Sequence, residues 1–205
     1  MNSRDPVPDR LIAVARELFT GRGYEGTSVR DITSRARANL GAITYHFGSK
    51  KSLYHKVIET FAEPMAERVA QAAQAPGTAL DKVEAIARAA LAHLLAHPGA
   101  PSILLRELAA DHPLPPPMAR VMKRNLTTLA EVIGAGQREG SIRRGDPVLL
   151  AMSVVSQPFF VRIAGRMIRE ALGLDPADPA QQARVVNHVA ESVRRVLANY
   201  PKAES

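Results

Sequence analysis

The sequence predicts an all-α protein of about nine helices, and three observations support this fold class. Apolar residues recur along most of the chain at the three- and four-residue spacing of one helix face. Alternating β-branched runs and Asn-Gly hairpin turns, the usual signals of strands, are nearly absent. Glycines and prolines interrupt the periodic segments at intervals that suit helices. The expected helices span Asp9–Arg22, Ser28–Ala36, Asn39–Phe47, Ser49–Ala75, Thr78–His97, Ile103–Ala110, Met118–Glu139, Pro147–Leu172 and Pro179–Tyr200.

Residues that start or stop helices bound the first three segments. Gly21 and Gly23 are stop signals for the first. Ser28, with an aspartate three residues later, approximates a capping box for the second. Asn39 is a favourable N-cap for the third, because its side chain can accept a hydrogen bond from a free backbone N–H. These two short helices therefore flank a tight turn.

Breakers also divide the rest of the chain. Ser49 can cap the fourth helix, which Pro64 is expected to bend and which ends before Pro76-Gly77. Either Thr78 or Asp81 starts the fifth helix. Pro98-Gly99, the Pro-rich loop at 112–117 and Gly140 separate the next three segments. Pro158 and Gly165 are expected to kink the helix at 147–172.

The composition supports a sizeable apolar core and narrows the chemistry. Of the 205 residues, 46% are hydrophobic. The chain has no cysteine, which excludes disulfides and thiolate chemistry and fits a reducing cytoplasm. No apolar run reaches transmembrane length, and the N-terminal residues contain no signal-peptide core. We therefore expect a soluble, cytoplasmic protein with no membrane partner.

Positive charge is concentrated near the N-terminus. Residues 1–55 hold nine Lys/Arg and five Asp/Glu, a net charge of +4, whereas residues 56–205 hold 18 and 15, a net of +3. A compact basic module suits a polyanionic partner such as a nucleic acid. Charge alone slightly favours the alternative, a solvated surface with a chance excess of positive residues.

Residues 28–50 have the layout of a helix-turn-helix, whose second helix enters the DNA major groove. Ile43 and Phe47, four residues apart, are expected to anchor the second helix to the core. Small or apolar side chains at the start of that helix allow close approach and contact with a thymine methyl group. From the residues themselves, the candidate DNA contacts are Ser28, Asn39, Leu40, Gly41, Ala42, Thr44, Tyr45, His46 and Lys50.

Three stretches together resemble the DNA-binding domain of TetR-family transcriptional regulators: ARELFTGRGYEGTSVRDI, the Gly41-Ala42-Ile43 core, and YHFGSK at Tyr45–Lys50. The resemblance covers residues 10–53. It implies that the helix at 39–47 reads the major groove and that an arginine placed like Arg30 also touches DNA. A plain core helix pair is the alternative interpretation of the segment.

The turn departs from the family pattern, because Arg37 stands where members commonly carry glycine. A bulky residue at positive φ costs about 1 kcal/mol. We therefore expect the turn to avoid that conformation. The alternative is that Arg37 is kept for a phosphate contact.

The resemblance implies a DNA-binding domain at residues 1–55 and a helical ligand-binding and dimerisation domain at 56–205. The implied function is that of a homodimeric repressor, released from a palindromic double-stranded operator by a small apolar effector. A regulator without such an effector, or a helical enzyme or carrier that retains a DNA-binding domain, are the alternatives. The chain has no catalytic motif, so we expect neither enzymatic activity nor a cofactor.

The last two expected helices are the predicted dimer interface, with intrachain packing as the alternative. One seam would comprise Ala151, Val154, Val155, Phe159 and Ile163, and the other Val185, Val189, Val193 and Leu197. Apolar side chains on inner helices are candidates for the effector pocket, although ordinary core packing is the commoner role of such residues. These candidates are Leu91, Leu94, Leu105, Met118, Met122, Leu126, Leu129, Met152 and Phe160.

Three further features bear on the function. ILLRELA at 103–109 and QPFFVRIAGRMI at 157–168 resemble a subset of the family similar to CecR/YbiH-type regulators. Arg106 and Glu107 are expected to form a surface ion pair, and the alternative is that they hold a polar group of a ligand. His93 and His97 have metal-ligand spacing, but no third ligand lies nearby in sequence unless folding brings His112 close, so we expect no metal site.

Overall fold

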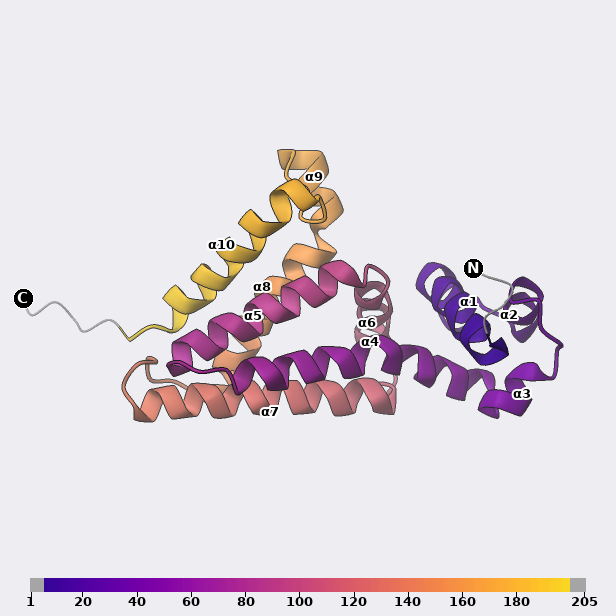
Figure 1. Cartoon of the computed structure of the whole chain (residues 1–205), viewed down its shortest axis with the longest axis horizontal. Coiled ribbons are helices and arrows are strands. Elements are labelled where there is room, and N and C mark those ends of the chain that lie inside the picture. The colour runs from indigo at the N-terminus through magenta and orange to yellow at the C-terminus, as the bar shows by residue number, and fades with distance from the viewer. Residues whose placement is uncertain (1–5, 200–205) are drawn as a thin grey trace, which may run out of the picture. The chain divides into compact units, whose positions relative to one another are not determined.

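The computed structural model of the chain describes residues 6–199, and within that range every regular element is a helix (Figure 1). The ten helices are α1 (Val7–Arg22), α2 (Val29–Arg35), α3 (Ala42–Phe47), α4 (Lys50–Ala73), α5 (Ala79–Ala96), α6 (Ala100–Ala109), α7 (Pro116–Arg138), α8 (Pro147–Ile163), α9 (Gly165–Leu172) and α10 (Pro179–Leu197). The all-α prediction is confirmed.

The expected count of about nine helices was one short, because the segment at 147–172 forms two helices. Ala164 ends α8 with its N–H bonded to the Phe160 carbonyl, and α9 then starts at Gly165. The two axes are bent by 62°. Glycine is a poor helix former, so it is a natural place for this break. Pro158, by contrast, lies inside α8 without ending it.

Other helix boundaries moved by a few residues. Both α6 and α7 start earlier than expected, because proline is tolerated in the first turn of a helix, where its missing N–H would have no partner. Pro64 stands inside α4, which runs continuously from Lys50 to Ala73. The last helix ends at Leu197, and the expected end at Tyr200 lies outside the described residues.

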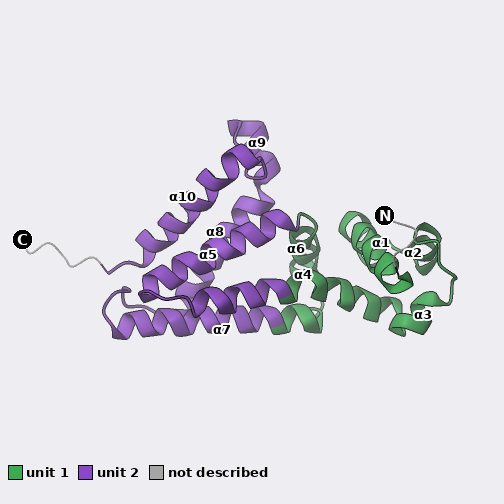
Figure 2. Cartoon of the chain, in the orientation of Figure 1, with its two compact units in different colours: residues 1–63, 98–120 green, residues 64–97, 121–205 purple. Residues whose placement is uncertain are grey.

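The contacts divide the chain into two compact units (Figure 2). Unit 1 comprises Met1–Glu63 and Pro98–Arg120, and unit 2 comprises Pro64–His97 and Val121–Ser205. Unit 1 therefore contains the helix-turn-helix, the first part of α4, and also α6. The functional boundary between residues 55 and 56 stays a prediction.

The core of unit 1 gathers one face of each of its N-terminal helices. Helix α1 buries five side chains at helical spacing: Leu11, Val14, Ala15, Leu18 and Phe19. Ile32 of α2, Ile43 of α3 and Leu53 of α4 are at most 1% exposed. Phe19 meets Tyr54 edge to face, with ring centroids 4.9 Å apart. This packing fixes α2 and α3 through their inner faces and leaves their outer faces free.

The core of unit 2 is built from α5, α7, α8 and α10, with the end of α4. Figure 1 shows α10 running beside α5 and α8. The seam predicted on the last helix faces this core: Val193 and Leu197 pack with α5 and α8 residues, and Val185 and Val189 pack with Leu91 of α5. All four side chains are buried within the chain. These four residues therefore make the intrachain packing that was the alternative to a dimer seam, because periodicity marks a buried face without naming its partner.

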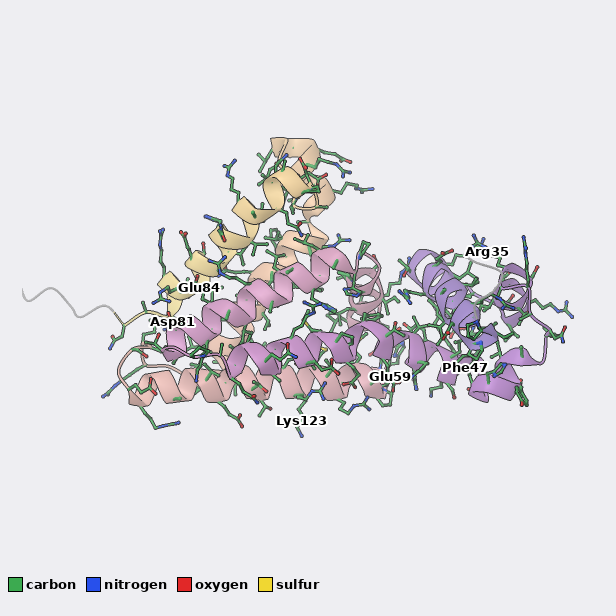
Figure 3. All side chains as sticks on the ribbon, in the orientation of Figure 1. Arg35, Phe47, Glu59, Asp81, Glu84 and Lys123 are labelled. Atoms are coloured by element: carbon green, nitrogen blue, oxygen red, sulfur yellow. The ribbon has the colours of Figure 1, made fainter. Side chains whose placement is uncertain are left out.

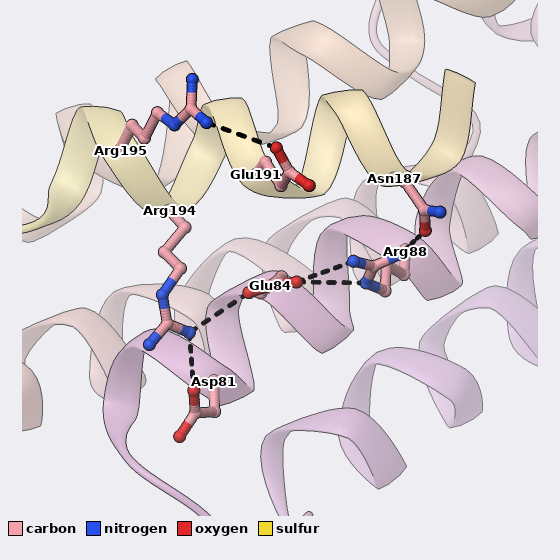
Figure 4. A network of polar contacts seen from close by, with 7 residues as sticks. All are labelled: Asp81, Glu84, Arg88, Asn187, Glu191, Arg194 and Arg195. Atoms are coloured by element: carbon pink, nitrogen blue, oxygen red, sulfur yellow. Dashed lines mark hydrogen bonds and ion pairs between the residues drawn. The ribbon is translucent and has the colours of Figure 1, made fainter. Parts of the chain in front are cut away.

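Polar contacts also join α5 to α10 (Figure 4). Arg194 donates to Asp81 at 2.6 Å and to Glu84 at 3.2 Å. Arg88 donates to Glu84 and to the Asn187 side chain. Asp81 also closes a capping box with Thr78 at the start of α5. The network thus fixes the register of α10 on α5.

Within residues 6–199, no single helix is long and apolar enough to cross a membrane. Helices α8 and α9 pass that test together, by length and composition only.

Candidate DNA-binding site

Helix α2 begins with the capping box that the sequence predicted. The Ser28 hydroxyl oxygen accepts a hydrogen bond from the Asp31 N–H at 3.0 Å, and the Asp31 carboxylate accepts from the Ser28 N–H at 3.1 Å. The Ser28 hydroxyl also donates to that carboxylate at 2.7 Å. These hydrogen bonds from Ser28 lower the pKa of Asp31 below its usual value. Asp31 is therefore ionised at the start of the helix, where negative charge is favourable.

The turn after α2 is a Schellman motif. The Arg37 N–H donates to the Ser34 carbonyl at 3.2 Å, and the Ala38 N–H donates to the Thr33 carbonyl at 2.9 Å. This pattern places the residue after the helix cap in the left-handed region, where glycine is usual. Arg37 occupies that position with φ of 51°. The expectation that the turn avoids positive φ was wrong, because these hydrogen bonds satisfy the last carbonyls of α2.

Helix α3 starts later than expected. Asn39 does not cap it: residues 39–41 form a turn in which the Ala42 N–H donates to the Asn39 carbonyl at 2.9 Å. The first residue of α3 is Ala42, and Gly48, with φ of 80°, ends the helix. The assignment of Asn39 as the helix start was therefore wrong by three residues.

The outer face of α3 is exposed, and its inner face is anchored. Ile43 is 1% exposed, whereas Tyr45 is 85% exposed. Figure 3 shows Phe47, half-buried, at the end of this helix. Thr44 and His46 are also exposed, and the His46 ring meets the Tyr45 ring edge to face at 4.8 Å. A large aromatic ring held in solvent on a rigid helix is suited to contact with another molecule.

A shallow hollow of about 450 Å³ lies beside this face. Side chains from the turn, from the start of α3 and from the first residue of α1 line it: Val7, Arg37, Ala38, Asn39, Gly41, Ala42, Tyr45 and His46. Five of the predicted DNA contacts therefore surround one surface feature. Of the other predicted contacts, Ser28, Arg30, Leu40 and Thr44 are exposed, and Lys50 is half-buried.

Lys50 has a second role that the sequence did not reveal. Its Nζ donates to the Tyr24 carbonyl at 2.8 Å and to the Thr27 carbonyl at 2.9 Å. The same ammonium lies 4.1 Å from the centroid of the Tyr24 ring. Lys50 thus ties the start of α4 to the loop before α2 through two of the three N–H groups of its ammonium.

Two arginine side chains fix neighbouring segments of unit 1 through hydrogen bonds to backbone carbonyls. Arg10 of α1 donates from Nε to the Ala36 carbonyl at 3.1 Å, which fixes the end of α2. Arg106 of α6 donates to the Gly21 carbonyl at 3.0 Å. The predicted surface ion pair between Arg106 and Glu107 was wrong, because Glu107 is 7% exposed and accepts a hydrogen bond from Tyr54.

The predicted pocket residues differ in their burial and are divided between the two units. Leu91, Leu94 and Leu129 are buried on unit 2 helices and Met118 is buried in unit 1, whereas Leu105, Met152 and Phe160 are 46%, 53% and 56% exposed. Met122 and Leu126 are half-buried. None of these residues lines any of three cavities among the described residues, which measure 430, 690 and 450 Å³. The rings of His93 and His97 stack with centroids 4.1 Å apart, and residues 6–199 hold no group of three potential metal ligands.

The predicted seam on α8 is split between its two faces. Ala151 and Val154 are buried in the unit 2 core, Phe159 is half-buried, and Val155 and Ile163 are exposed. Two further apolar residues of α8, Val148 and Leu149, were missed from the sequence and are 53% and 62% exposed. Because α8 is apolar on both faces, its periodicity could not tell the outer face from the inner one.

An anchored helix pair with an exposed second helix, attached to a further helical unit, defines a helix-turn-helix DNA-binding regulator. Two family models match the chain: bacterial regulatory proteins of the tetR family over residues 11–57, and the tetracyclin repressor-like C-terminal domain over residues 80–193. Because the second match alone covers more than half of the chain, the protein belongs to the TetR family of DNA-binding transcriptional regulators.

Relatives in sequence and structure agree with this family. The HTH-type transcriptional repressor Rv3405c of Mycobacterium tuberculosis is 25% identical over 194 residues, which are 95% of this chain and 90% of that one. A regulatory protein in the tetR family from Rhodococcus RHA1 superimposes with a TM-score of 0.77 at 19% identity, covering 96% of this chain and all of that one. AibR, solved with isovaleryl coenzyme A and operator DNA, gives 0.72 at 18% identity, covering 91% and 97%.

Proposed function

We propose that this chain is a homodimeric repressor that binds a palindromic operator through α3. The observation that carries the proposal is the exposure of Tyr45, at 85%, on a helix whose opposite side is anchored by Ile43, at 1%. The similar sequence of a protein named as a repressor, Rv3405c, supports the sign of regulation.

The proposed contacts are those that the sequence singled out. Leu40 and Ala42 would meet thymine methyl groups, while Thr44, Tyr45 and His46 would offer polar atoms to bases or phosphates. Ser28, Arg30, Asn39 and Lys50 would hold the DNA backbone, and Gly41 allows close approach of the main chain. Contacts of this second kind set position and affinity, whereas contacts to base edges set sequence preference.

The test is binding to DNA by the purified chain. A duplex selected from a random-sequence library should be bound more tightly than a scrambled duplex at physiological salt, and its protected region should contain two inverted half-sites. Half-sites of a two-fold dimer lie about one helical turn apart, or a multiple of it. Equal binding of selected and scrambled duplexes would contradict the proposal.

For the dimer, we propose that the exposed apolar face of α8 is the contact between subunits. This face carries Val148, Leu149, Met152, Val155, Phe160 and Ile163. Exposed apolar residues so close together on one helix are unusual on a monomer surface and mark an interaction site. A second copy of the chain is the proposed partner at this face, because two inverted half-sites need two DNA-binding domains related by a two-fold axis.

Oligomeric state tests this interface with a matched pair of variants. Leu149→Glu on α8 should shift the mass measured by light scattering from dimer to monomer, because the interface would bury an unpaired carboxylate. Leu108→Glu, at a leucine of α6 that is 48% exposed, changes the same chemistry outside α8 and should leave the dimer intact. If light scattering gives the same mass for both variants, the exposed face of α8 is not the dimer interface.

For regulation, we propose that unit 2 binds a small-molecule effector. The structural likeness to AibR, which was solved with isovaleryl coenzyme A, supports that molecule as the first ligand to test. A ligand can release the protein from its operator only if it binds the conformer that does not bind DNA more tightly than the conformer that does. The complex of the parent chain with its operator should dissociate when that ligand is added.

A regulator without an effector is the second candidate. The burial of Leu91 and Leu129, both 0% exposed, favours it, because neither of these predicted pocket residues borders a space that a ligand could fill. An operator complex that persists in the presence of the ligand would support this candidate. The narrower likeness to CecR/YbiH-type regulators stays a prediction.

A further inference from the structure

The turn of the helix-turn-helix holds an unfavourable backbone conformation. Among residues 6–199, Arg37 is the one non-glycine residue with positive φ. The two Schellman hydrogen bonds, from the Arg37 and Ala38 N–H groups, require this backbone conformation whichever side chain stands at position 37. Glycine would adopt it without the clash between Cβ and the carbonyl oxygen. An arginine at this position therefore costs folding free energy.

Within residues 6–199, no contact of this side chain offsets that cost. Arg37 is exposed, and no described residue accepts a hydrogen bond or an ion pair from its guanidinium. Strained residues of this kind persist where the strain serves a function. A molecule outside the chain that binds the guanidinium would supply this compensation.

The place of Arg37 identifies that molecule. Its side chain lines the same hollow as Asn39, Tyr45 and His46, at the turn that leads into α3. Arginine binds phosphate oxygens through a planar fork of donors, and contacts from residues flanking a recognition helix go mostly to the DNA backbone. We propose that Arg37 binds an operator phosphate. This inference rests on the proposed operator binding through α3.

Three proteins test the contact: the parent, Arg37→Gly and Arg37→Lys. Glycine keeps the Schellman backbone and removes the charge, so a loss of affinity cannot come from a damaged turn. With the duplex selected by the parent, we expect Arg37→Gly to bind about tenfold more weakly at physiological salt. The slope of log affinity against log salt should fall by about 0.9 for each protomer bound. Arg37→Lys should retain that slope.

Thermal unfolding without DNA supplies the second readout. Arg37→Gly should raise the midpoint of unfolding, because it relieves the strain, while Arg37→Lys should leave the midpoint unchanged. The charge control is Arg166→Gln, at an arginine of α9 whose side chain is 83% exposed, which should change neither the midpoint nor the salt slope by a comparable amount.

The outcomes separate this inference from the proposed function. If the parent binds its operator and Arg37→Gly keeps the parent's affinity and salt slope, the phosphate contact is absent, although operator binding stands. An unchanged slope with weakened binding would also overturn it, and so would a lower midpoint for Arg37→Gly. If the parent shows no sequence preference, the proposed function fails, and this inference fails with it.

Discussion

The Tyr54 hydroxyl of α4 donates a hydrogen bond to Oε1 of Glu107 in α6, and the two oxygens lie 2.5 Å apart. Both side chains are buried, at 6% and 7% exposure. Burial and the hydrogen bond to the Glu107 carboxylate raise the pKa of Tyr54. His112 Nε2 lies 3.9 Å from the other carboxylate oxygen. The contact fixes α6 against the helices that carry the helix-turn-helix within unit 1.

Tyr54→Phe should lower the free energy of unfolding, because it leaves the Glu107 carboxylate buried without its donor. The expected loss is about 1–3 kcal/mol, measured by urea unfolding. The double variant Tyr54→Phe with Glu107→Gln should lose less than the sum of the single changes, because the second change removes the unpaired charge. Additive losses would show that the hydrogen bond does not couple the two residues.

Lys50→Met should reduce stability as well as operator affinity, because Lys50 holds two carbonyls of the loop before α2. Methionine keeps the apolar stem and removes the donors and the contact with the Tyr24 ring. The expected cost is about 1–3 kcal/mol in the free energy of unfolding. Lys51→Met, at the exposed neighbouring lysine, is the matched control and should be nearly neutral for stability.

Comparison with Tyr45→Ala separates the two roles of Lys50. Tyr45 is 85% exposed, so its truncation should weaken operator binding strongly and leave unfolding unchanged. If Lys50→Met unfolds like the parent, the tie to the Tyr24 and Thr27 carbonyls does not contribute to stability, and Lys50 acts on DNA alone.

Local signals in the sequence predicted the site best. The capping box at Ser28 depends on residues three apart, so it could be recognised without knowledge of the fold. The conformation of Arg37 could not be predicted in this way. Glycine is usual at positive φ, so an arginine argued against that conformation, and the hydrogen bonds that require positive φ depend on where α2 ends. The partner of Val189 was equally hidden, since an apolar stripe looks the same whether it faces α5 or a second subunit. Lys50 was recognised as basic, but its acceptors lie more than 20 residues earlier in the chain.

The ion pair between Arg194 and Asp81 should make part of the stability depend on pH. The Arg194 hydrogen bond, followed by those from Thr78, lowers the pKa of Asp81 to about 2. In the unfolded chain an aspartate has a pKa of about 3.9. Because the folded value is lower, this contribution is fully present above the unfolded pKa and is lost as pH falls towards 2.

Asp81→Asn should therefore be less stable than the parent at pH near neutrality, and the difference should shrink as pH falls through this window. Urea unfolding of both proteins at a series of pH values measures it. Asp111→Asn is the control, since Asp111 is exposed and forms no hydrogen bond with a described residue. If the difference in free energy of unfolding between the parent and Asp81→Asn stays constant down to pH 2, the contribution of Asp81 to stability does not depend on its charge.

Two glycines of α7 should respond in opposite directions to alanine. In an open helix position this change stabilises by about 0.5–1 kcal/mol, because alanine restricts the unfolded chain and favours the helix. Gly134 offers such a position: an added Cβ would meet only the Arg138 guanidinium, at 3.6 Å. At Gly136 the same atom would lie 2.6 Å from Ile142 Cδ1 and 2.7 Å from Ala79 Cβ. Gly136→Ala should therefore cost about 1–3 kcal/mol, because the fully buried Ile142 has little room to move. Urea unfolding of the two variants compares the signs directly. Stabilisation by both changes would mean that α7 and the loop carrying Ile142 can separate at no cost, and the close approach at Gly136 would not hold the unit 2 core together.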